Sequence, residues 1–353
     1  MSGEEAPARD RRRGGNGHRV TSHDVAAAAG VSQSTVSRAL RGDPKISPAT
    51  RDRIMAVVDQ LGYRVNTAAR SLITSRTQTM GVAVADITNP FYPFLLDALY
   101  REFRELGYST LLFAEVTDGD EARADPLSPL LVQSVDGLVA ASATIGSDLG
   151  DAAERQHVPV VFLLRHVGDK RHDRVVSDNV GGGQAVARLL HDLGHTKIAM
   201  ISGPSNTSTA IERDQGFLEE LERLGLPPDA VDCRRGPYAH RTGYDEMLAL
   251  LREDDPPTAV FCGNDVIAFG ALDAAETLGC SVPQDLSIVG FNDIPIAGWR
   301  RVNLTTVRQP LRDMARAAVR MLVERVDAPD LEPRCQVFPV ELVYRGTTGP
   351  PPG

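Results

Sequence analysis

From residue 77 onward the chain alternates between short apolar segments and amphipathic segments, and this alternation restricts the possible folds more than any other feature. Residues 80–85, Met-Gly-Val-Ala-Val-Ala, are apolar throughout, as expected of a strand that is buried on both faces. Between Phe94 and Leu106 the apolar residues instead recur at helical spacing. Repeated β-α units build mostly parallel sheets that helices cover through right-handed crossovers. The region therefore belongs to the α/β class.

The same pattern continues nearly to the C-terminus. The further strands that it predicts are 108–114, 135–141, 158–164, 197–202, 258–262 and 286–291. The further helices are 182–193, 210–224, 240–252, 264–278 and 311–325. These β-α units are more than one sheet usually contains, and we therefore expect two similar doubly wound lobes.

Residues 19–65 predict three short helices instead. Thr21 and Asp24 have the spacing of a capping box, and Gly30 ends the helix that follows. Ser32 can cap a second helix. Ser47-Pro48 places an N-cap before a proline at the first helical position, and Gly62 ends this third helix.

The first two of these helices have the properties of a helix-turn-helix. The alanines at 26–29 allow close helix crossing, and four apolar side chains can share one small core: Val25, Val31, Val36 and Leu40. The polar residues near the start of the second helix are then candidates for contact with base edges in the major groove: Gln33, Ser34, Thr35, Ser37 and Arg38. The alternative is an ordinary helical hairpin with a polar face.

The charge distribution supports a nucleic-acid-binding head. Residues 1–76 carry 13 Lys and Arg against 7 Asp and Glu, whereas the rest carries 25 against 40. A basic head on an acidic body indicates that only the head binds a polyanion. The chain shows no membrane span or secretory signal, so we expect a cytoplasmic protein without membrane contact. The four cysteines lack metal-ligand or disulfide spacing and are expected to be buried.

Residues 20–72 resemble the head of LacI/GalR family transcriptional regulators. The motifs are D-V-A…G-V-S-x-x-T-V-S-R, within 24–38, and L-G-Y-x-x-N-x-x-A-x-x-L, which is residues 61–72. The remaining body is similar to the two-lobed, periplasmic-binding-protein-like effector domain of that family. The resemblance implies a homodimeric, sequence-specific repressor that binds a palindromic DNA operator. It also implies a small-molecule effector, a sugar or related metabolite, that controls operator affinity.

In that family a hinge helix follows the head, folds on DNA and inserts a leucine into the minor groove. By position the hinge contacts here are Asn66, Ala69 and Leu72. A leucine wedge can unstack a base step and bend the duplex. The alternative is a plain linker. The expected layout is a disordered tail (1–18), the helix-turn-helix domain (19–65), the hinge (66–76), the effector-binding and dimerisation domain (77–348) and a C-terminal tail (349–353).

Ligands of doubly wound lobes bind beyond the carboxyl ends of strands. Residues that follow predicted strands there are Asn89, Phe91, Tyr92, Arg165, Asn264, Asp265 and Asn292. Amide groups suit sugar hydroxyls, and aromatic faces suit C–H surfaces. The family resemblance implies effector contacts at Asn89, Phe91, Arg165, Asn264 and Asn292, and adds Arg213 and Gln309.

Some of these positions allow more than one interpretation. Leu164 and Asn292 stand where sugar-binding relatives often carry carboxylates, so the ligand could be anionic or less polar than a simple sugar. The alternative role of Asp265 is helix capping. Trp299, the only tryptophan, is expected either near the cleft or in the core.

The sequence leaves two other functions to consider, an enzyme and a pure small-molecule-binding protein. Glycines at 181–183 between a predicted strand and helix could indicate dinucleotide binding, but the third fingerprint position is Val186 and the next strand ends without an acid. No nucleophile-elbow, P-loop or zinc-protease motif occurs, and we expect no catalysis, cofactor or metal. The other alternative is a small-molecule-binding protein without DNA regulation, against which the DNA-binding head argues.

Overall fold

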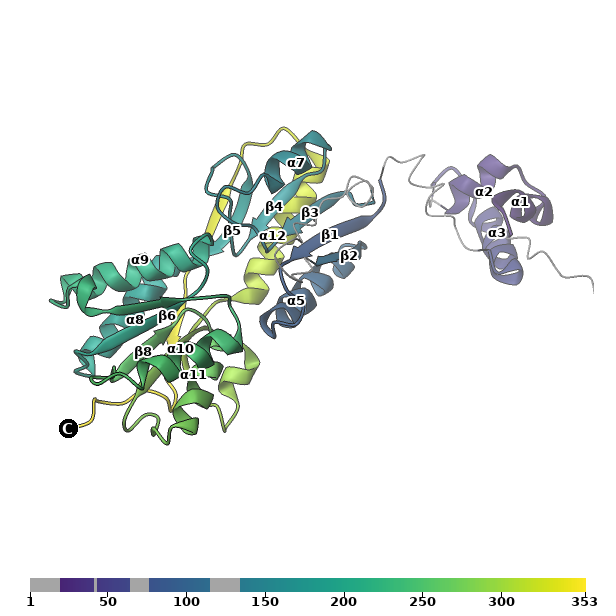
Figure 1. The fold of residues 1–353 in the computed structure, drawn as a ribbon. Helices are drawn as coiled ribbons and strands as arrows, with labels where there is room; N and C mark the ends of the chain where they lie inside the picture. Colours follow the sequence, from purple (N-terminus) through teal and green to yellow (C-terminus); the bar gives the residue numbers. More distant parts are fainter. Residues whose placement is uncertain (1–19, 41–42, 64–75, 115–133) are drawn as a thin grey trace, which may run out of the picture. The chain divides into compact units, whose positions relative to one another are not determined.

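The computed structural model describes residues 20–40, 43–63, 76–114 and 134–353. These residues fall into two compact units, one within Met1–Ser75 and the other formed by Arg76–Gly353 (Figure 1).

The first unit consists of the helices α1 (Ser22–Ala29), α2 (Gln33–Leu40) and α3 (Pro48–Leu61). The capping box of Thr21 and Asp24 is present, and Gly30 and Gly62 end α1 and α3 with left-handed backbone angles. Ser32 Oγ accepts a hydrogen bond from the Thr35 amide at the start of α2. The three helices pack around a small core of Val25, Ala26, Ala29, Val36, Ala39, Ile54 and Val58. The expected three-helix head is confirmed.

The second unit has two lobes, and we call the one that starts the unit the first lobe. It contains β1 (Thr79–Val84), α5 (Phe91–Glu105), β2 (Ser109–Ala114), β3 (Gly137–Ala140), α7 (Leu149–Arg155), β4 (Val160–Leu163), β5 (Asp173–Ser177), α12 (Leu311–Asp327) and β11 (Cys335–Phe338). Its sheet has the strand order β11-β5-β4-β3-β1-β2, and every adjacent pair is parallel. One apolar core joins this sheet to α5 and α12, and another joins it to α7.

The second lobe repeats this architecture. It contains α8 (Asn179–Asp192), β6 (Ile198–Ser202), α9 (Ser208–Arg223), η1 (Pro228–Ala230), β7 (Asp232–Arg235), α10 (His240–Leu250), β8 (Ala259–Cys262), α11 (Asp265–Thr277), β9 (Ser287–Asn292), η2 (Pro295–Gly298), β10 (Thr305–Arg308) and β12 (Glu341–Val343). The strand order is β12-β10-β9-β8-β6-β7, and β12 alone is antiparallel to its neighbour. Helices α8 and α9 cover one face and α10 and α11 the other (Figure 1). The two doubly wound lobes are as expected.

The chain passes between the lobes three times: from β5 to α8, from β10 to α12 and from β11 to β12 (Figure 1). We call these three segments the crossings. Because α12 and β11 follow the second lobe in sequence but pack in the first, the lobes are not sequential domains. Short parallel crossings of this kind let two lobes rotate relative to each other while each core stays intact.

Glycines in the second lobe bring helices into close contact. A Cβ atom on Gly183 would lie 2.3 Å from the carbonyl oxygen of Arg213, and one on Gly216 would lie 2.1 Å from that of Val180. Asp178 caps the start of α8 by accepting from the Gly181 amide at 2.8 Å. The carboxylate would repel a phosphate at this helix terminus, so the glycines serve packing of α8 on α9 rather than dinucleotide binding.

The sequence-based prediction lacks β7, β10, β11, β12 and α7, and it includes β5 only as the strand, without bounds, before the glycines at 181–183. The strand β7 alternates half-buried and exposed residues and carries two arginines, and β11 is largely exposed at the edge of its sheet. Such edge strands lack the continuous apolar signal of a central parallel strand. They were missed for this reason.

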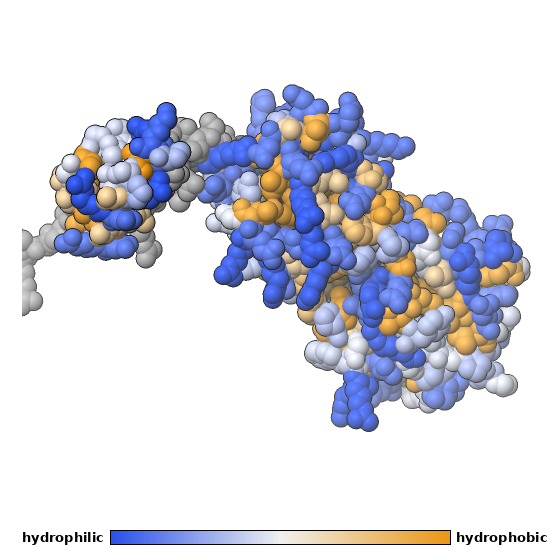
Figure 2. Space-filling model, turned by 180° about the vertical axis from the view of Figure 1, so that it is seen from behind, coloured by the Kyte–Doolittle hydropathy of each residue, from blue (hydrophilic) through white to orange (hydrophobic). Residues whose placement is uncertain are grey.

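Two smaller expectations are wrong. Trp299 lies neither in the core nor in the cleft, because it follows η2 on the surface with 61% of its area exposed. Of the four cysteines only Cys262 is buried, and Cys233 and Cys335 are exposed. On the face shown in Figure 2, hydrophobic residues form small clusters among hydrophilic ones. None of the helices that the structure describes is long and apolar enough to span a bilayer.

Candidate ligand pocket and nucleic-acid interface

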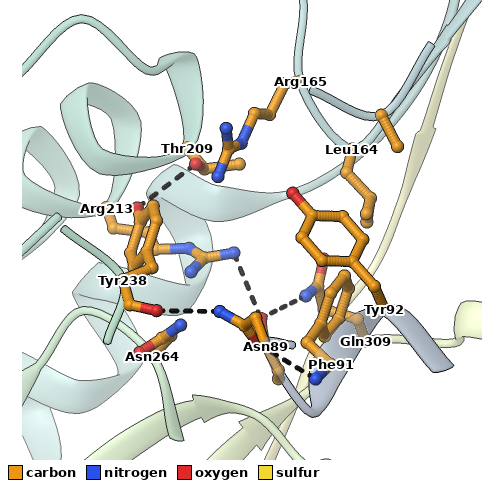
Figure 3. Close-up of a pocket in the computed structure, with 12 residues that line it drawn as sticks. Asn89, Phe91, Tyr92, Leu164, Arg165, Thr209, Arg213, Tyr238, Asn264 and Gln309 are labelled. Atoms are coloured by element: carbon orange, nitrogen blue, oxygen red, sulfur yellow. Dashed lines mark hydrogen bonds between the residues drawn. The ribbon is translucent and has the colours of Figure 1, made fainter. Parts of the chain in front are cut away.

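A pocket lies between the two lobes of the second unit (Figure 3). The first lobe lines it with Asn89, Phe91, Tyr92, Ala141, Leu164 and Arg165. The second lobe and its crossing line it with Thr209, Arg213, Tyr238, Asn264, Asn292 and Gln309. Most of these residues follow the carboxyl ends of strands, where ligands of doubly wound lobes bind.

Asn89 and the aromatic residues after it form one part of the first-lobe wall. Asn89 Oδ1 accepts from the Phe91 amide at 3.0 Å, which fixes the turn that starts α5. Its Nδ2 donates to the carbonyl oxygen of Tyr238 at 2.8 Å and so connects the two lobes. The rings of Phe91 and Tyr92 pack edge to face with centroids 5.7 Å apart. This wall offers aromatic surface beside an amide that is already used to hold the lobes together.

Leu164 and Arg165 form the other part of that wall. Leu164 has a φ of 70°, which is unusual for a bulky residue and turns the chain sharply after β4. The turn presents Arg165 toward the pocket, where its guanidinium carbon lies 5.5 Å from the centre of the Tyr238 ring (Figure 3). A cation over an aromatic ring at this distance is a favourable arrangement.

Arg213 dominates the second-lobe wall. The side chain is almost fully buried, and its Nη1 donates to the carbonyl oxygen of Gly263 at 2.7 Å. Its Nε donates to Asn179 Oδ1 at 3.0 Å and its Nη2 to Asn292 Oδ1 at 3.4 Å. The guanidinium stacks on Phe291, 3.7 Å from the ring centre. Burial lowers the pKa of Arg213, because removal from water penalises the charged form.

Hydrogen bonds connect the pocket to two of the three crossings. Gln309, between β10 and α12, donates from Nε2 to Asn292 Oδ1 at 2.6 Å. Ser177, at the end of β5, donates to Gln309 Oε1 at 2.7 Å. A ligand that contacts Asn292 or Gln309 therefore acts directly on the segments about which the lobes would move.

Asn264 and Asp265 are adjacent but have different environments. Asn264 caps α11 by accepting from the Ile267 amide at 2.9 Å, and its side chain also lines the pocket. Asp265 does not line the pocket, since its carboxylate accepts from the Ile294 amide at 2.8 Å and from Thr306 Oγ1 at 2.5 Å. Nor is it the helix cap. Complete burial raises the pKa of Asp265 to about 6, despite these two hydrogen bonds.

A second polar contact between the lobes lies beside the pocket. His166 Nε2 lies 3.0 Å from Glu212 Oε1, and Asn179 donates to Glu212 Oε2 at 2.8 Å. Burial alone would raise the pKa of Glu212, but these hydrogen bonds outweigh it and the pKa is lowered. The lowered pKa favours the ionised form of Glu212, and both of its carboxylate oxygens have a hydrogen-bonding partner.

Sequence reasoning missed Tyr238, Thr209 and Ala141 as pocket residues. Tyr238 follows β7, and since that strand was not predicted, the residues beyond its end were not considered. Thr209 lies in the first turn of α9 after β6, and Ala141 follows β3 directly. The rule of looking beyond strand ends would have identified these two residues.

In the head, α2 buries Val36 and Ala39 and leaves its polar residues Gln33, Ser34, Thr35, Ser37 and Arg38 half-buried or exposed. Arg38 Nε donates to Asp43 Oδ2 at 2.8 Å, and Gln33 Nε2 donates to Ser22 Oγ at 3.3 Å. These side chains come from the first two turns of one helix, as a helix that enters the major groove requires. The hinge residues Asn66, Ala69 and Leu72 lie outside the described residues.

Comparison with known proteins identifies the family. Residues 21–66 match the model described as bacterial regulatory proteins, lacI family, and residues 187–348 match that of a periplasmic binding protein-like domain. The ribose operon repressor of Escherichia coli K12 is 34% identical over 332 residues, which cover 93% of this chain and 99% of the repressor. The chain belongs to the lacI family.

Solved structures of this family agree with the fold. The lac repressor dimer bound to operator and the anti-inducer ONPF has a TM-score of 0.83 at 28% identity, over 94% of this chain and 99% of that one. A LacI family regulator from Enterococcus faecium with bound ribose has a TM-score of 0.69 at 28% identity, over 77% of this chain and 99% of that one. This chain is thus a DNA-binding transcriptional regulator, and these relatives are regulators rather than enzymes.

Proposed function

We propose that this lacI-family regulator is a homodimeric repressor that binds a palindromic DNA operator. A carbohydrate-like effector either weakens or strengthens the repressor's affinity for that operator. The regulator has no catalytic role, and because its target is DNA we place it in the cytoplasm. The observation that carries the proposal is that one chain combines a helix-turn-helix head with a pocket lined by both lobes of its body.

The proposed DNA contacts are at the start of α2. Gln33, Ser34, Thr35, Ser37 and Arg38 would face the major groove, where arginine suits guanine and glutamine suits adenine. Asp43 holds Arg38 at 2.8 Å in the described structure and would orient the guanidinium before DNA contact. For Asn66, Ala69 and Leu72 the family resemblance supports a hinge role, with Leu72 as the minor-groove wedge. Two heads in a symmetric dimer would read two half-sites.

The proposed effector site is the inter-lobe pocket. Its contacts would be Asn89, Phe91, Tyr92, Arg165, Arg213, Asn264, Asn292 and Gln309, which line one space in the structure. A ligand that contacts both lobes stabilises one arrangement of the lobes over others. The difference between its affinities for these arrangements determines how strongly ligand binding changes the affinity for the operator. The hydrogen bonds of Gln309 and Ser177 offer a physical connection from the ligand to the crossings.

The experiment that tests this function is selection of the purified full-length protein on a random double-stranded DNA library, with candidate sugars absent and present. We expect enrichment of a palindrome whose half-sites lie about one helical turn apart. Failure to enrich any motif under both conditions would contradict DNA regulation and leave a small-molecule-binding protein.

The same selection with Arg38→Ala tests the assignment of the reading helix. The substitution is expected to relax base preference at one position of each half-site at a cost of about 1 to 3 kcal/mol. Arg53→Ala is the matched control, since Arg53 is an exposed arginine of the same head on α3 and should leave the selected sequence unchanged. An unchanged motif with Arg38→Ala would remove Arg38 as a base reader.

A further inference from the structure

The residues that line the pocket carry positive charge without a carboxylate among them. Of the twelve lining residues two are arginines, Arg165 and Arg213, and the others are neutral. The two guanidiniums are close enough that the charge of Arg165 contributes to lowering the pKa of Arg213, after the larger effect of burial. The pocket is therefore a cationic space inside a body whose overall charge is negative.

The acceptors around Arg213 are all uncharged. It donates to the carbonyl oxygen of Gly263 and to the amide oxygens of Asn179 and Asn292. The nearby carboxylates have other partners, since Glu212 accepts from Asn179 and contacts His166, and Asp265 accepts from Ile294 and Thr306. Among the described residues, no ion pair to Arg213 is formed.

Arg165 has still fewer partners. It is half-buried at the pocket wall, and within the described part of the chain its guanidinium makes neither a hydrogen bond nor an ion pair. Its guanidinium lies over the face of the Tyr238 ring. The neighbouring Leu164 adds an apolar side chain to the same wall, and Figure 3 shows the Arg165 side chain among the residues that line the pocket. The guanidinium of Arg165 therefore lines the pocket with donors that no described protein acceptor uses.

A charged group that is withdrawn from water is costly unless a partner of opposite charge replaces the lost hydration. A guanidinium matches carboxylate and phosphate oxygens in a two-pronged geometry, and such charge-assisted hydrogen bonds are stronger than neutral ones. We infer that the effector of this pocket carries an anionic group, a carboxylate or a phosphate, which pairs with Arg165.

The rest of the lining defines what else the effector contains. Asn264, Asn292 and Gln309 offer amide groups for hydroxyls, and Phe91 and Tyr92 offer aromatic faces for C–H surfaces. A sugar ring with a charged substituent offers hydroxyls and C–H surface to these groups beside an anion for Arg165. The ligand class is therefore an acidic monosaccharide, either a sugar acid or a sugar phosphate. This inference rests on the proposed function, because it concerns the same pocket.

The test is isothermal titration of the full-length protein with ring-matched probes. D-glucose, D-glucuronate and D-glucose 6-phosphate share one ring and differ at C6, and D-ribose and D-ribose 5-phosphate form a second series. We expect a charged member to bind at least about tenfold more tightly than its neutral parent. Glucuronate and the phosphates distinguish the two sources of charge. Inorganic phosphate is included as the smallest anionic probe.

Two variants change the charge of the pocket, one by removing the Arg165 cation and one by placing a carboxylate beside it. Arg165→Gln should abolish the preference for the charged member, whereas Arg155→Gln, at an exposed arginine of α7 in the same lobe, should retain it. Leu164→Asp should fold, since aspartate accepts a φ of 70° more readily than leucine, and it should shift the preference toward the neutral parent by pairing with Arg165.

Three results would overturn the inference: a neutral parent that binds as tightly as its charged counterpart, a preference that survives Arg165→Gln, or no binding of any anionic probe at millimolar concentration. None of these titrations requires DNA. A protein that enriches an operator but fails these titrations refutes the anionic effector alone, whereas one that passes them and enriches no DNA refutes the regulatory function.

Discussion

Two sites in the body, one in each lobe, bury charged side chains in different ways. In the first lobe the carboxylate of Asp173 is buried at the start of β5, where Arg325 Nε donates to it at 3.0 Å and the Arg334 amide at 2.7 Å. In the second lobe the buried Arg213 and Asp265 have only neutral hydrogen-bonding partners.

The pKa values follow this difference. Burial would raise the pKa of Asp173, but the hydrogen bonds from Arg325 and Arg334 outweigh it and lower the pKa. At Asp265 burial prevails and the pKa rises to about 6. The first lobe thus neutralises its buried charge locally, at the junction of β5, α12 and β11. The second lobe pairs its buried Asp214 and Glu220 with arginines in the same way. It leaves Arg213 and Asp265 without ion pairs near the pocket, where a ligand could compensate the positive charge.

The largest effect is expected from Asp173→Asn. The substitution leaves Arg325 and Arg334 without their carboxylate, and loss of one partner of a buried ion pair lowers the free energy of unfolding by about 3 kcal/mol. Urea denaturation at neutral pH measures this change. Asp97→Asn is the control, because the exposed pair of Asp97 and Arg101 should contribute less than about 1 kcal/mol. Equal losses in the two variants would show that the Asp173 cluster is not a stabilising device.

The next effect is a pH dependence that involves Asp265. Its folded pKa, about 6, lies above the ordinary value of 3.8, so its protonation favours the folded state. The contribution is fully present below about pH 4 and is lost as the pH rises through about 6. Relative to Asp265→Asn, the unfolding free energy of the natural protein should therefore fall by up to about 3 kcal/mol between these limits. A difference that is constant with pH would mean that the carboxylate is ionised throughout.

Much of this architecture could be predicted from the sequence. The central strands of both sheets are continuous apolar runs, and the capping residues Thr21, Ser32 and Ser47 predict the helices of the head. These signals are local, since they depend on few neighbouring residues. The edge strands β7 and β11 form only because a neighbouring strand supplies hydrogen-bond partners, and their own residues carry no such pattern.

The pocket was predictable where a residue follows a recognisable strand, as for Asn89, Arg165 and Asn292. Tyr238 was not, because it depends on the unrecognised β7. Asp265 shows the converse error, because it was predicted to line the pocket and does not. It follows a strand beside Asn264, but its carboxylate turns into the lobe to accept from Ile294 and Thr306, which are distant in sequence. Partners of that kind are set by tertiary structure and leave no sign at the residue itself.

The smallest stability change is expected from Arg213→Met, which removes the buried cation while keeping an apolar side chain of similar length. Loss of the donor leaves the Gly263 carbonyl oxygen without its partner, which costs free energy, but the protein no longer has to bury a charge without an ion pair. These contributions have opposite signs, so we expect a decrease of only about 1 kcal/mol in urea denaturation. A decrease as large as that of Asp173→Asn would contradict the distinction between the two sites, because Arg213 would then be as much a structural element as Asp173.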